Sequence, residues 1–539
     1  MIGVGEWARF WADYEPDAVA LIDDHQTVTW KELNLRVGQL AMGLRQLGVR
    51  SGDRVATLTS NRVEHFELLF ACARAGAVLV PLNPMLTAAE IAFNCEDAGV
   101  SVVVTEPELE HLIERAVRVA PGRIIVMIRA DGEHSWEWLH RRGQLTTDDA
   151  ASGDDPLLLC YTSGTTGRPK GAILSHANIE AMASGAIAFD QLTPDDRTII
   201  TVPLAYNGGG VSMPLPLLKA GGSVLIRKDF EPARMLDDIE RYSITSIGVV
   251  PVILERMARE PGFATADLSS WRAAKCGGAD APEHLLALYQ SHGVKLSAAY
   301  GLTEAGGFNI LLPPQDARRK LGFIGMPVLG QQARVVDAND DEVPPGVRGE
   351  LLIRGDCVFQ GYWQNGPATQ EVLRGGWLHT GDVAAKDEEG YYRIVDRVKD
   401  MIISGGINIY PAEVESALLA HPDVLEVAVV GMPDPEWGEA PVAFVVTDNR
   451  GLTLEDLTKF SADRLARYKR PKRLVLVEGF PRGSSGKVLK RSLREMLSTS
   501  GGCDPGSPGA RTAAEPEAAT ATAHPKDSNK LEVGPSVGS

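Results

Sequence analysis

Cysteine is scarce in this sequence. Its 539 residues include six cysteines, and no two of them form a Cys-x-x-Cys pair. Six cysteines are too few to build a disulfide framework in a chain of this length, so we expect buried free thiols in a reducing compartment. The eleven histidines contain no His-x-x-x-His spacing, which leaves a zinc site without support.

Excess positive charge and long apolar runs are also lacking. The chain has 54 Lys and Arg against 71 Asp and Glu, a net charge of −17 at pH 7, which argues against nucleic acid or an anionic membrane as a partner. No apolar run reaches the roughly 18 residues of a membrane span. The first residues, with Glu6 and Trp7, lack the basic-then-apolar order of a signal peptide. We therefore expect a soluble cytoplasmic protein.

What is present in the first 400 residues is an alternation of helix-like and strand-like patterns. One helix face is predicted by apolar residues at spacings of three and four, followed by Gly48 as a helix end: Leu33, Val37, Leu40, Leu44 and Leu47. Short apolar runs at 54–59, 79–82, 101–105 and 124–128 are typical of buried strands. This alternation predicts an α/β fold, with parallel-rich sheets covered by helices on both faces.

The residue pattern changes at two points in the rest of the chain. Near Gly330, short apolar runs are separated by Asp, Asn, Pro and Gly turns, which predicts a small antiparallel, β-barrel-like region. After Asp396, helix patterns at 411–420 and 454–465 and strand patterns at 424–431 and 440–446 predict a small mobile α+β domain. We expect an N-terminal domain at 1–396, containing two α/β subdomains and the β region, and a C-terminal domain at 397–497. Residues 498–539 have almost no aromatic content, which predicts a disordered tail.

The strongest motif follows the apolar run 157–161. It reads Thr-Ser-Gly-Thr-Thr-Gly-Arg-Pro-Lys-Gly over residues 162–171. We interpret it as a strand, a loop rich in Gly, Ser and Thr, and then a helix, an arrangement that holds phosphates with backbone N–H groups. Pro169 stands where a Walker A loop requires glycine. The alternative is a flexible surface loop.

The string 162–171 resembles the signature of the adenylate-forming superfamily, which includes acyl-CoA synthetases, luciferases and peptide-synthetase adenylation domains. Four further strings resemble that family and follow in its order: Tyr300–Glu304, Gly376–Asp382, Asp396–Asp400 and Gly483–Lys487. The resemblance covers about residues 7–497. It implies ATP, Mg²⁺ and coenzyme A as cofactors or co-substrates.

The resemblance also implies an ATP site. Its residues would be Thr162, Ser163, Gly164, Thr165, Thr166, Gly167, Lys170, Gly278, Ala279, Tyr300, Gly301, Asp382 and Arg397. Tyr300 would stack on adenine, and Asp382 would accept from both ribose hydroxyls. The alternatives are a core aromatic for Tyr300 and a turn-forming residue for Asp382.

Charge must be neutralised when a carboxylate approaches the α-phosphate of ATP. The resemblance implies that Glu304 and Thr166 bind Mg²⁺, that Thr303 contacts the α-phosphate, and that Lys487 is delivered there by domain closure. The alternatives are a solvated carboxylate at the start of a helix for Glu304 and a solvated lysine for Lys487.

Further residues would serve the second step. Lys399 occupies the family's hinge position, and Gly405 and Gly406 line the implied coenzyme A path; a plain linker is the alternative. A basic cluster in the C-terminal region includes Lys469 and Arg470. We expect it either to contact the phosphates of coenzyme A or to form a solvated helix face.

The predicted acyl pocket contains many small residues. Its members are Tyr206, Gly208, Gly209, Val250, Gly277 and Gly306. Small side chains leave volume, which favours a bulky apolar acid that is fatty, aryl or polycyclic; the alternative is that the glycines serve turns. Tyr206 stands where many relatives carry histidine, so no relative's acid preference is transferred.

The predicted function is an ATP-dependent carboxylic acid–CoA ligase that makes an acyl-adenylate and then a thioester. The alternative is an adenylating enzyme that loads a separate carrier protein. A luciferase-like oxygenase has no specific residue in its support, and the intact set Glu304, Asp382, Arg397 and Lys487 argues against a nucleotide-binding regulator without catalysis. The expected partners are small molecules, and a homodimer is left open.

Overall fold

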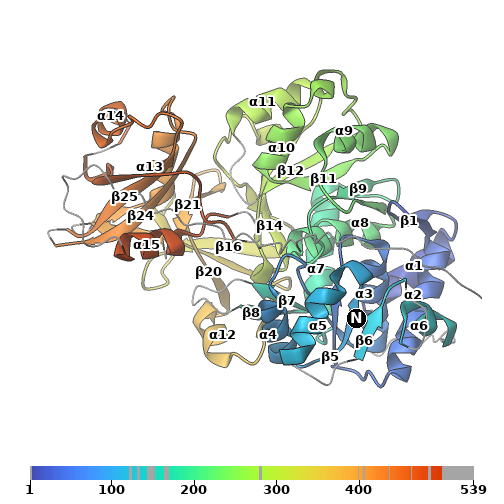
Figure 1. Cartoon of the computed structure of the whole chain (residues 1–539). Coiled ribbons are helices and arrows are strands. Elements are labelled where there is room, and N and C mark those ends of the chain that lie inside the picture. The colour runs from blue at the N-terminus through green and yellow to red at the C-terminus, as the bar shows by residue number, and fades with distance from the viewer. Residues whose placement is uncertain are drawn as a thin grey trace, which may run out of the picture.

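The computed structural model of the chain is shown in Figure 1. It describes residues 3–119, 124–129, 134–142, 151, 153–162, 169–277, 282–397, 400–404, 407–435, 437–462, 464–465, 467–483 and 487–499. Within these residues no helix is both long enough and apolar enough to span a membrane.

The first large sheet has seven strands. In spatial order they are β18 (Gly361–Tyr362), β8 (Lys170–Ser175), β7 (Pro156–Thr162), β4 (Val78–Pro81), β3 (Arg54–Leu58), β5 (Val100–Thr105) and β6 (Ile124–Met127). The four strands predicted from short apolar runs are β3, β4, β5 and β6, which pair in parallel as expected. The strands β7 and β8 form an antiparallel hairpin.

Helices cover both faces of this sheet. They are α1 (Glu6–Tyr14), α2 (Trp30–Gln46), α3 (Val63–Ala75), α4 (Ala88–Ala98), α5 (Glu110–Val119) and α6 (Trp136–Arg142). Strand side chains alternate between two cores: Val55 and Val102 join α2 and α3, whereas Ala56 and Val103 join α4 and α5. This alternation follows from the two-residue period of a strand and confirms the two-sided burial that the sequence predicts.

The helix predicted from spacings of three and four is α2. Its N-terminus is a capping box, in which Thr29 accepts from the Glu32 N–H and Glu32 accepts from the Thr29 N–H. Gly48 follows the helix end with a φ of +91°, a conformation that favours glycine.

The second large sheet has nine strands. In order they are β15 (Met326–Pro327), β14 (Gly307–Leu311), β13 (Leu296–Leu302), β12 (Ala273–Gly277), β11 (Ser246–Val249), β9 (Arg197–Ile200), β10 (Ser223–Ile226), β1 (Val19–Ile22) and β2 (Thr27–Thr29). The run from β13 to β1 is parallel, and the other pairings are antiparallel.

Five helices flank this sheet: α7 (His176–Asp190), α8 (Pro214–Ala220), α9 (Pro232–Arg241), α10 (Pro251–Ala258) and α11 (Glu283–Ser291). The last three share one core, whereas α7 and α8 belong to the same core as α2 and α3. All thirteen residues of α3 are buried, because this helix lies in the core that the two large sheets share.

A smaller antiparallel sheet follows, in the region where the sequence predicts one. It contains β16 (Gln331–Val336), β17 (Arg348–Gly355), β20 (Trp377–Lys386), β19 (Leu373–Arg374) and β21 (Tyr392–Arg397), and α12 (Gly366–Val372) lies between β18 and β19 in the chain. The end of β13 and all of β14 border this sheet, which brings Tyr300 next to β20 and β21.

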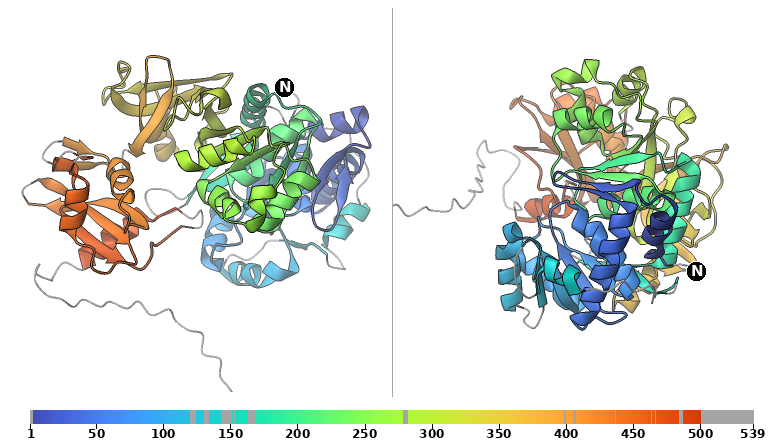
Figure 2. Two further views of the ribbon diagram at one scale, coloured as in Figure 1. Left: turned by 90° about the horizontal axis from the view of Figure 1, so that it is seen from above. Right: turned by 90° about the vertical axis from the view of Figure 1, so that its right-hand side faces the viewer.

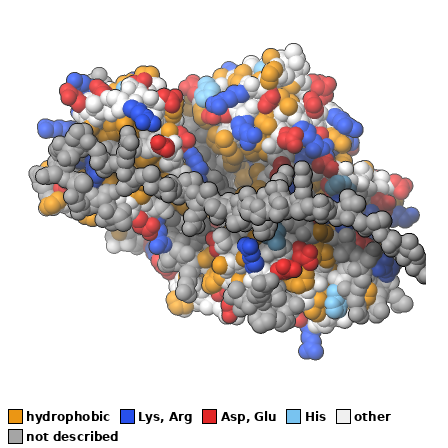
Figure 3. Space-filling view, viewed as in Figure 1, with side chains coloured by type: hydrophobic (Ala, Val, Ile, Leu, Met, Phe, Trp, Pro, Cys, Tyr) orange, Lys and Arg blue, Asp and Glu red, His pale blue; other side chains and the backbone are white. Residues whose placement is uncertain are grey.

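The C-terminal unit has a sheet of its own. It contains β23 (Ile407–Ile409), β22 (Ile402–Ser404), β25 (Gly438–Val446), β24 (Glu426–Asp434) and β26 (Arg473–Val477). One face carries α13 (Pro411–Leu419) and α14 (Leu454–Phe460), and the other carries α15 (Lys490–Thr499). Figure 2 shows this unit at one end of the molecule, and Figure 3 shows a hollow between it and the lobe of α9–α11.

Two boundaries differ from the predictions. The helix predicted to reach residue 465 ends at Phe460, where Ser461 turns its hydroxyl back to the Leu457 carbonyl. The last helix, α15, continues to Thr499, two residues into the predicted tail, because Leu493 and Leu497 are buried against β24 and β25. The remainder of that tail lies outside the described residues.

Candidate active site

Three predicted ATP-site residues meet where the second large sheet borders the small one. Tyr300 lies on β13, and its hydroxyl donates to Oδ2 of Asp382 on β20 at 2.6 Å. The backbone of Arg397 on β21 pairs with that of Asp382. Asp382 is buried inside a strand, so the alternative of a turn-forming aspartate is wrong. A half-buried ring beside a carboxylate offers one surface for a base and one acceptor for a ribose.

Glu304 is held by two hydroxyls. It lies in a single 3-10 turn, Thr303–Ala305, directly after β13, with Gly301 exposed at the end of that strand. Its Oε1 accepts from the Tyr362 hydroxyl at 2.8 Å and from the Thr162 hydroxyl at 3.4 Å. These bonds make Glu304 a positioned group, in contrast to the solvated carboxylate of the alternative.

Tyr362 also contacts the predicted phosphate site. The Lys170 ammonium lies 5.1 Å from the centre of the Tyr362 ring. Thr162 and Lys170 are paired across the β7–β8 hairpin, so Glu304, Tyr362, Thr162 and Lys170 form one cluster. Tyr362 was missed from the sequence because only the pairing of β18 with β8 brings it here.

The loop of the strongest motif joins two strands. The sequence predicts a helix directly after it, but the chain forms β8 and begins α7 only at His176. The prediction was wrong because residues 170–175 pair with β7. Several predicted residues lie outside the described ones: Ser163, Gly164, Thr165, Thr166, Gly167, Gly278, Ala279, Lys399, Gly405 and Gly406.

The donor set at Glu304 fits a hard cation. One carboxylate and nearby hydroxyls offer only oxygen, the ligand type that magnesium takes, and magnesium bound to nucleotide phosphates needs few protein ligands. Among the described residues there is no group of three His, Cys, Asp or Glu side chains that could hold a metal alone.

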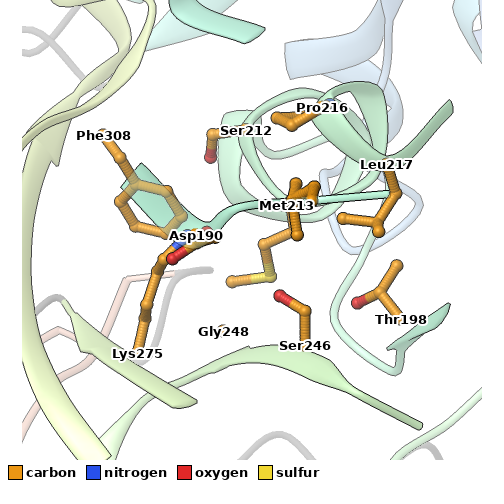
Figure 4. Close-up of a pocket in the computed structure, with 11 residues that line it drawn as sticks. Asp190, Thr198, Ser212, Met213, Pro216, Leu217, Ser246, Gly248, Lys275 and Phe308 are labelled. Atoms are coloured by element: carbon orange, nitrogen blue, oxygen red, sulfur yellow. The ribbon is translucent and has the colours of Figure 1, made fainter. Parts of the chain in front are cut away.

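A pocket lies on one face of the second large sheet (Figure 4). Its lining residues are Asp190, Leu192, Thr198, Ser212, Met213, Pro216, Leu217, Ser246, Gly248, Lys275 and Phe308. Gly248 on β11 pairs with Lys275 on β12, and the predicted Gly277 lies two residues further along β12 on the same face. Phe308 is 3.8 Å from the position of a Cβ at Gly277, so the predicted glycine marks the rim of this pocket.

One side of the pocket carries a buried ion pair. Lys275 is 7% exposed and Asp190 is 9% exposed, and the ammonium contacts the Asp190 carboxylate. The ammonium also lies 5.3 Å from the centre of the Phe308 ring. Burying such a pair costs desolvation energy, which its mutual attraction must offset. The sequence offered no signal for this pair, because its members are 85 residues apart.

Two of the glycines predicted to leave volume in the acyl pocket lie instead where another backbone segment approaches closely. A Cβ at Gly209 would lie 2.5 Å from the Pro203 carbonyl oxygen, and one at Gly306 would lie 2.6 Å from that of Cys357. The alternative that glycines serve turns is therefore correct at these two positions. At Gly208 a Cβ would meet the Met213 methyl at 3.8 Å, an ordinary contact.

None of the six predicted pocket residues is among those that line this pocket. Tyr206 is half-buried, and its hydroxyl accepts from the Asn83 amide at 2.8 Å. Val250 is exposed directly after β11, where it precedes α10.

Comparison with known proteins adds the decisive observation. The model of the AMP-binding enzyme family matches residues 8–363, and that of the AMP-binding enzyme C-terminal domain matches residues 413–487. The chain belongs to the AMP-binding enzyme family. The resemblance seen in its motifs is thereby confirmed.

The most similar relatives include acid–CoA ligases. Feruloyl-CoA synthase of an Amycolatopsis species is 40% identical, over 92% of this chain and 99% of that protein. Indoleacetate–CoA ligase of Aromatoleum aromaticum is 38% identical, over 92% of this chain and 98% of that protein. This AMP-binding enzyme is therefore an AMP-forming acid–thiol ligase of the acyl-CoA synthetase type.

Solved structures agree with the fold. ATP-bound MatB from Rhodopseudomonas palustris superposes with a TM-score of 0.84 at 32% identity, covering 92% of this chain and 99% of that one. MenE from Bacillus subtilis, in complex with an acyl-adenylate intermediate, has a TM-score of 0.82 at 31% identity and covers 91% of this chain and 98% of that one.

In the C-terminal unit of this AMP-binding enzyme, Lys487 is exposed beside α15. Its carbonyl accepts from the Gly483 N–H at 2.9 Å, which closes the loop that carries it. The two basic residues singled out for coenzyme A are engaged within the unit. Lys469 pairs with Glu413, and Arg470 donates to the Leu465 and Ala462 carbonyls. These contacts favour a structural role for both.

Proposed function

We propose that this enzyme joins an aryl acid of one or two rings, with a polar group at its far end, to coenzyme A. The single observation that carries the proposal is the position of the Lys275–Asp190 pair on one side of the pocket. The similarity to relatives named for feruloyl and indoleacetate supports the same class.

The depth of the pocket as far as Met213 and Lys275 follows from strand geometry. Gly277 at the rim and Lys275 at the polar end are two residues apart on one strand, which corresponds to about 7 Å. A phenyl ring with its first substituent spans about that distance, whereas an extended fatty chain is several times longer. Since Gly209 and Gly306 do not create extra volume, this short distance favours the aryl option over the fatty and polycyclic ones.

In the first step, a carboxylate oxygen of the acid attacks the α-phosphorus of ATP, and pyrophosphate leaves. Magnesium, when bound, would neutralise phosphate charge. Tyr300 and Asp382 would hold the adenosine, Glu304 would bind the metal, and Lys487 would neutralise charge at the α-phosphate. In the second step, the sulfur of coenzyme A attacks the carbonyl carbon, AMP leaves, and the thiol proton passes to solvent.

The polar end of the pocket would bind the substituent at the far end of the acid. The Lys275 ammonium can donate to a phenol or carbonyl oxygen, while Asp190 keeps the buried site neutral. A site built to bind a polar group rejects the analogue without it, because the buried charges then lose a partner. We therefore expect 4-hydroxycinnamate to be preferred over cinnamate.

The test is pyrophosphate release across 4-hydroxycinnamate, ferulate, cinnamate, indoleacetate, 4-hydroxybenzoate and palmitate, with products identified by mass. We expect an aryl-CoA thioester from at least one hydroxylated acid, and palmitate as the only productive acid would contradict the proposal. The paired variant Lys275→Met/Asp190→Leu, which leaves no lone buried charge, should reduce the preference for 4-hydroxycinnamate over cinnamate by about tenfold or more.

The acceptor thiol is tested in the same assay. Fatty acid–[acyl-carrier-protein] ligase ScoC of Streptomyces coeruleorubidus is 35% identical, over 90% of this chain and 95% of that protein, which keeps a carrier protein as the second candidate. Release of acyl-AMP without thioester, in the presence of coenzyme A, would favour that candidate.

A further inference from the structure

One side chain divides the pocket. Met213 lies across its middle (Figure 4), with Asp190, Lys275, Phe308 and Ser212 on one side and Thr198, Ser246 and Leu217 on the other. Its tip packs on the bare backbone of Gly248, since a Cβ there would lie 2.5 Å from the Met213 methyl carbon and 2.9 Å from its sulfur. The missing side chain at 248 is thus replaced by the side chain of Met213.

Part of the pocket lining lies behind this residue. Ser246 is two residues deeper than Gly248 on β11, about 7 Å further from the rim, and it pairs with Thr198 on β9. Both side chains are buried, and both line the same pocket as Lys275, together with the buried Leu192 and Leu217. The back wall of the pocket, defined by these four residues, therefore carries two hydroxyls and two apolar side chains.

The side chain of Met213 can adjust its conformation, whereas the strands around it are fixed in the sheet. Methionine is unbranched and adapts to the space around it. Met213 is half-buried at the junction between a π-helical turn, Gly208–Ser212, and α8, so its backbone is fixed by regular structure while its side chain reaches the sheet. The strand residues around it belong to the central parallel sheet.

We propose that Met213 sets the length limit for the acid, and that shortening it opens the pocket as far as the back wall. Aryl acids extended at the para position by two to four heavy atoms, such as 4-alkoxycinnamates, would then become substrates. This inference rests on the proposed function, because it assumes that the far end of the acid reaches Lys275 and Met213.

The experiment compares wild type and Met213→Ala on 4-hydroxy-, 4-ethoxy- and 4-butoxycinnamate, with thioester formation measured as kcat/KM. For wild type we expect kcat/KM to fall at least tenfold from the shortest acid to the longest. In Met213→Ala the ratio of 4-butoxy to 4-hydroxy should rise at least tenfold. An unchanged ratio in a variant that still uses 4-hydroxycinnamate would overturn the proposal.

Two further variants sharpen the test. Met213→Leu keeps the volume and should keep the wild-type length profile. Gly248→Ala places a methyl group against the Met213 tip and should reduce activity on all three acids, and Met213→Ala should relieve that loss in the double variant. If Met213→Ala does not fold, Met213→Val gives the same ratio test with a smaller change.

The outcomes separate the two proposals. If wild type makes no thioester from any aryl acid, the proposed function and this inference both fail. If wild type uses 4-hydroxycinnamate but Met213→Ala and Met213→Val both keep its length profile, the proposed function stands and only the role of Met213 is rejected.

Discussion

Tyr362 is the residue that most directly positions Glu304. Its hydroxyl supplies the shorter of the two hydrogen bonds to Oε1, and its ring lies beneath the Lys170 ammonium. A hydrogen bond to a charged group contributes about 1.5–3 kcal/mol, so its loss should be measurable without a change in fold.

Tyr362→Phe removes this hydroxyl and keeps the ring. We expect about a ten- to hundredfold loss in kcat/KM for pyrophosphate release, and a higher Mg²⁺ concentration for half-maximal rate, because the Glu304 carboxylate is no longer held. A magnesium titration of both proteins tests this. An unchanged Mg²⁺ dependence would show that Thr162 alone is sufficient.

His176 links a buried hydrogen bond to acid sensitivity. Its Nδ1 accepts from the Val4 N–H at 3.0 Å, and burial lowers the pKa of His176 to about 4. The unfolded chain protonates near its ordinary pKa of about 6.5. The stability that depends on the neutral ring is therefore complete above pH 6.5 and is lost as the pH falls from 6.5 towards 4.

His176→Asn keeps an acceptor near the position of Nδ1 and removes the titration. Between pH 7.5 and pH 5 the free energy of unfolding of wild type should fall by about 2 kcal/mol more than that of the variant. Urea unfolding at the two pH values measures the difference. Parallel losses in the two proteins would assign the acid sensitivity to other groups.

At the residue scale, the sequence predicted the site residues that belong to short, recognisable motifs. Tyr300 contacts Asp382, and Glu304 contacts Thr162 of the strongest motif. Lys275, Asp190, Met213 and Tyr362 could not be found in that way, because each gains its role from a partner on a distant strand or helix.

At the element scale, the π-helical turn Gly208–Ser212 packs closely on the segment before it. A Cβ at Gly210 would lie 2.1 Å from the Leu204 carbonyl oxygen, and one at Gly209 would lie 2.5 Å from that of Pro203. Neither carbonyl oxygen can move away unless the backbone that carries it also shifts. At Gly208 the nearest atom to such a Cβ is the Met213 methyl, at 3.8 Å.

Gly209→Ala and Gly208→Ala therefore form a matched pair. We expect Gly209→Ala to lower the free energy of unfolding by about 2–4 kcal/mol, as backbone strain does, and Gly208→Ala to change it by less than about 1 kcal/mol. Thermal unfolding of the two variants separates close backbone approach from glycine's general flexibility. Equal shifts in Tm would contradict the steric account.

The clearest error of prediction at the element scale concerns the segment that follows the strongest motif. Residues 170–175 were expected to lead into a helix, yet they pair with β7 and form the strand β8. Pairing of a nearby strand outweighs local pattern, because a buried hairpin satisfies its backbone groups while burying alternate side chains. The parallel strands β3 to β6 were predictable, because short apolar runs between helices are typical of buried strands in a parallel sheet.

At the scale of the whole molecule, the C-terminal unit contacts the rest through a few polar groups. The Asp396 carboxylate accepts from the Ala412 N–H at 2.8 Å, and the Arg348 guanidinium lies 4.8 Å from the centre of the Tyr410 ring. Its own cores are separate from those of the two large sheets. Such an interface permits rotation between two working orientations.

Lys487→Ala should separate the two half-reactions. We expect pyrophosphate release to fall at least about a hundredfold, the size of one lost transition-state donor, because the lysine is delivered only for the first step. If Lys487 serves only the first step, thioester formation from a presynthesised acyl-adenylate should stay within a few-fold of wild type. Stopped-flow measurement of each half-reaction tests this, and equal losses in both would reject alternation of the C-terminal unit.

The wholly buried helix α3 has a consequence for how the enzyme unfolds. Because α3 belongs to a single core with α2, α7 and α8, neither large sheet keeps a complete interior without the other. Residues 3–397 should therefore melt as one cooperative unit in calorimetry, with the C-terminal unit as a second transition. It follows that the chain can be cut between its two units, but not within the first, without loss of the nucleotide site.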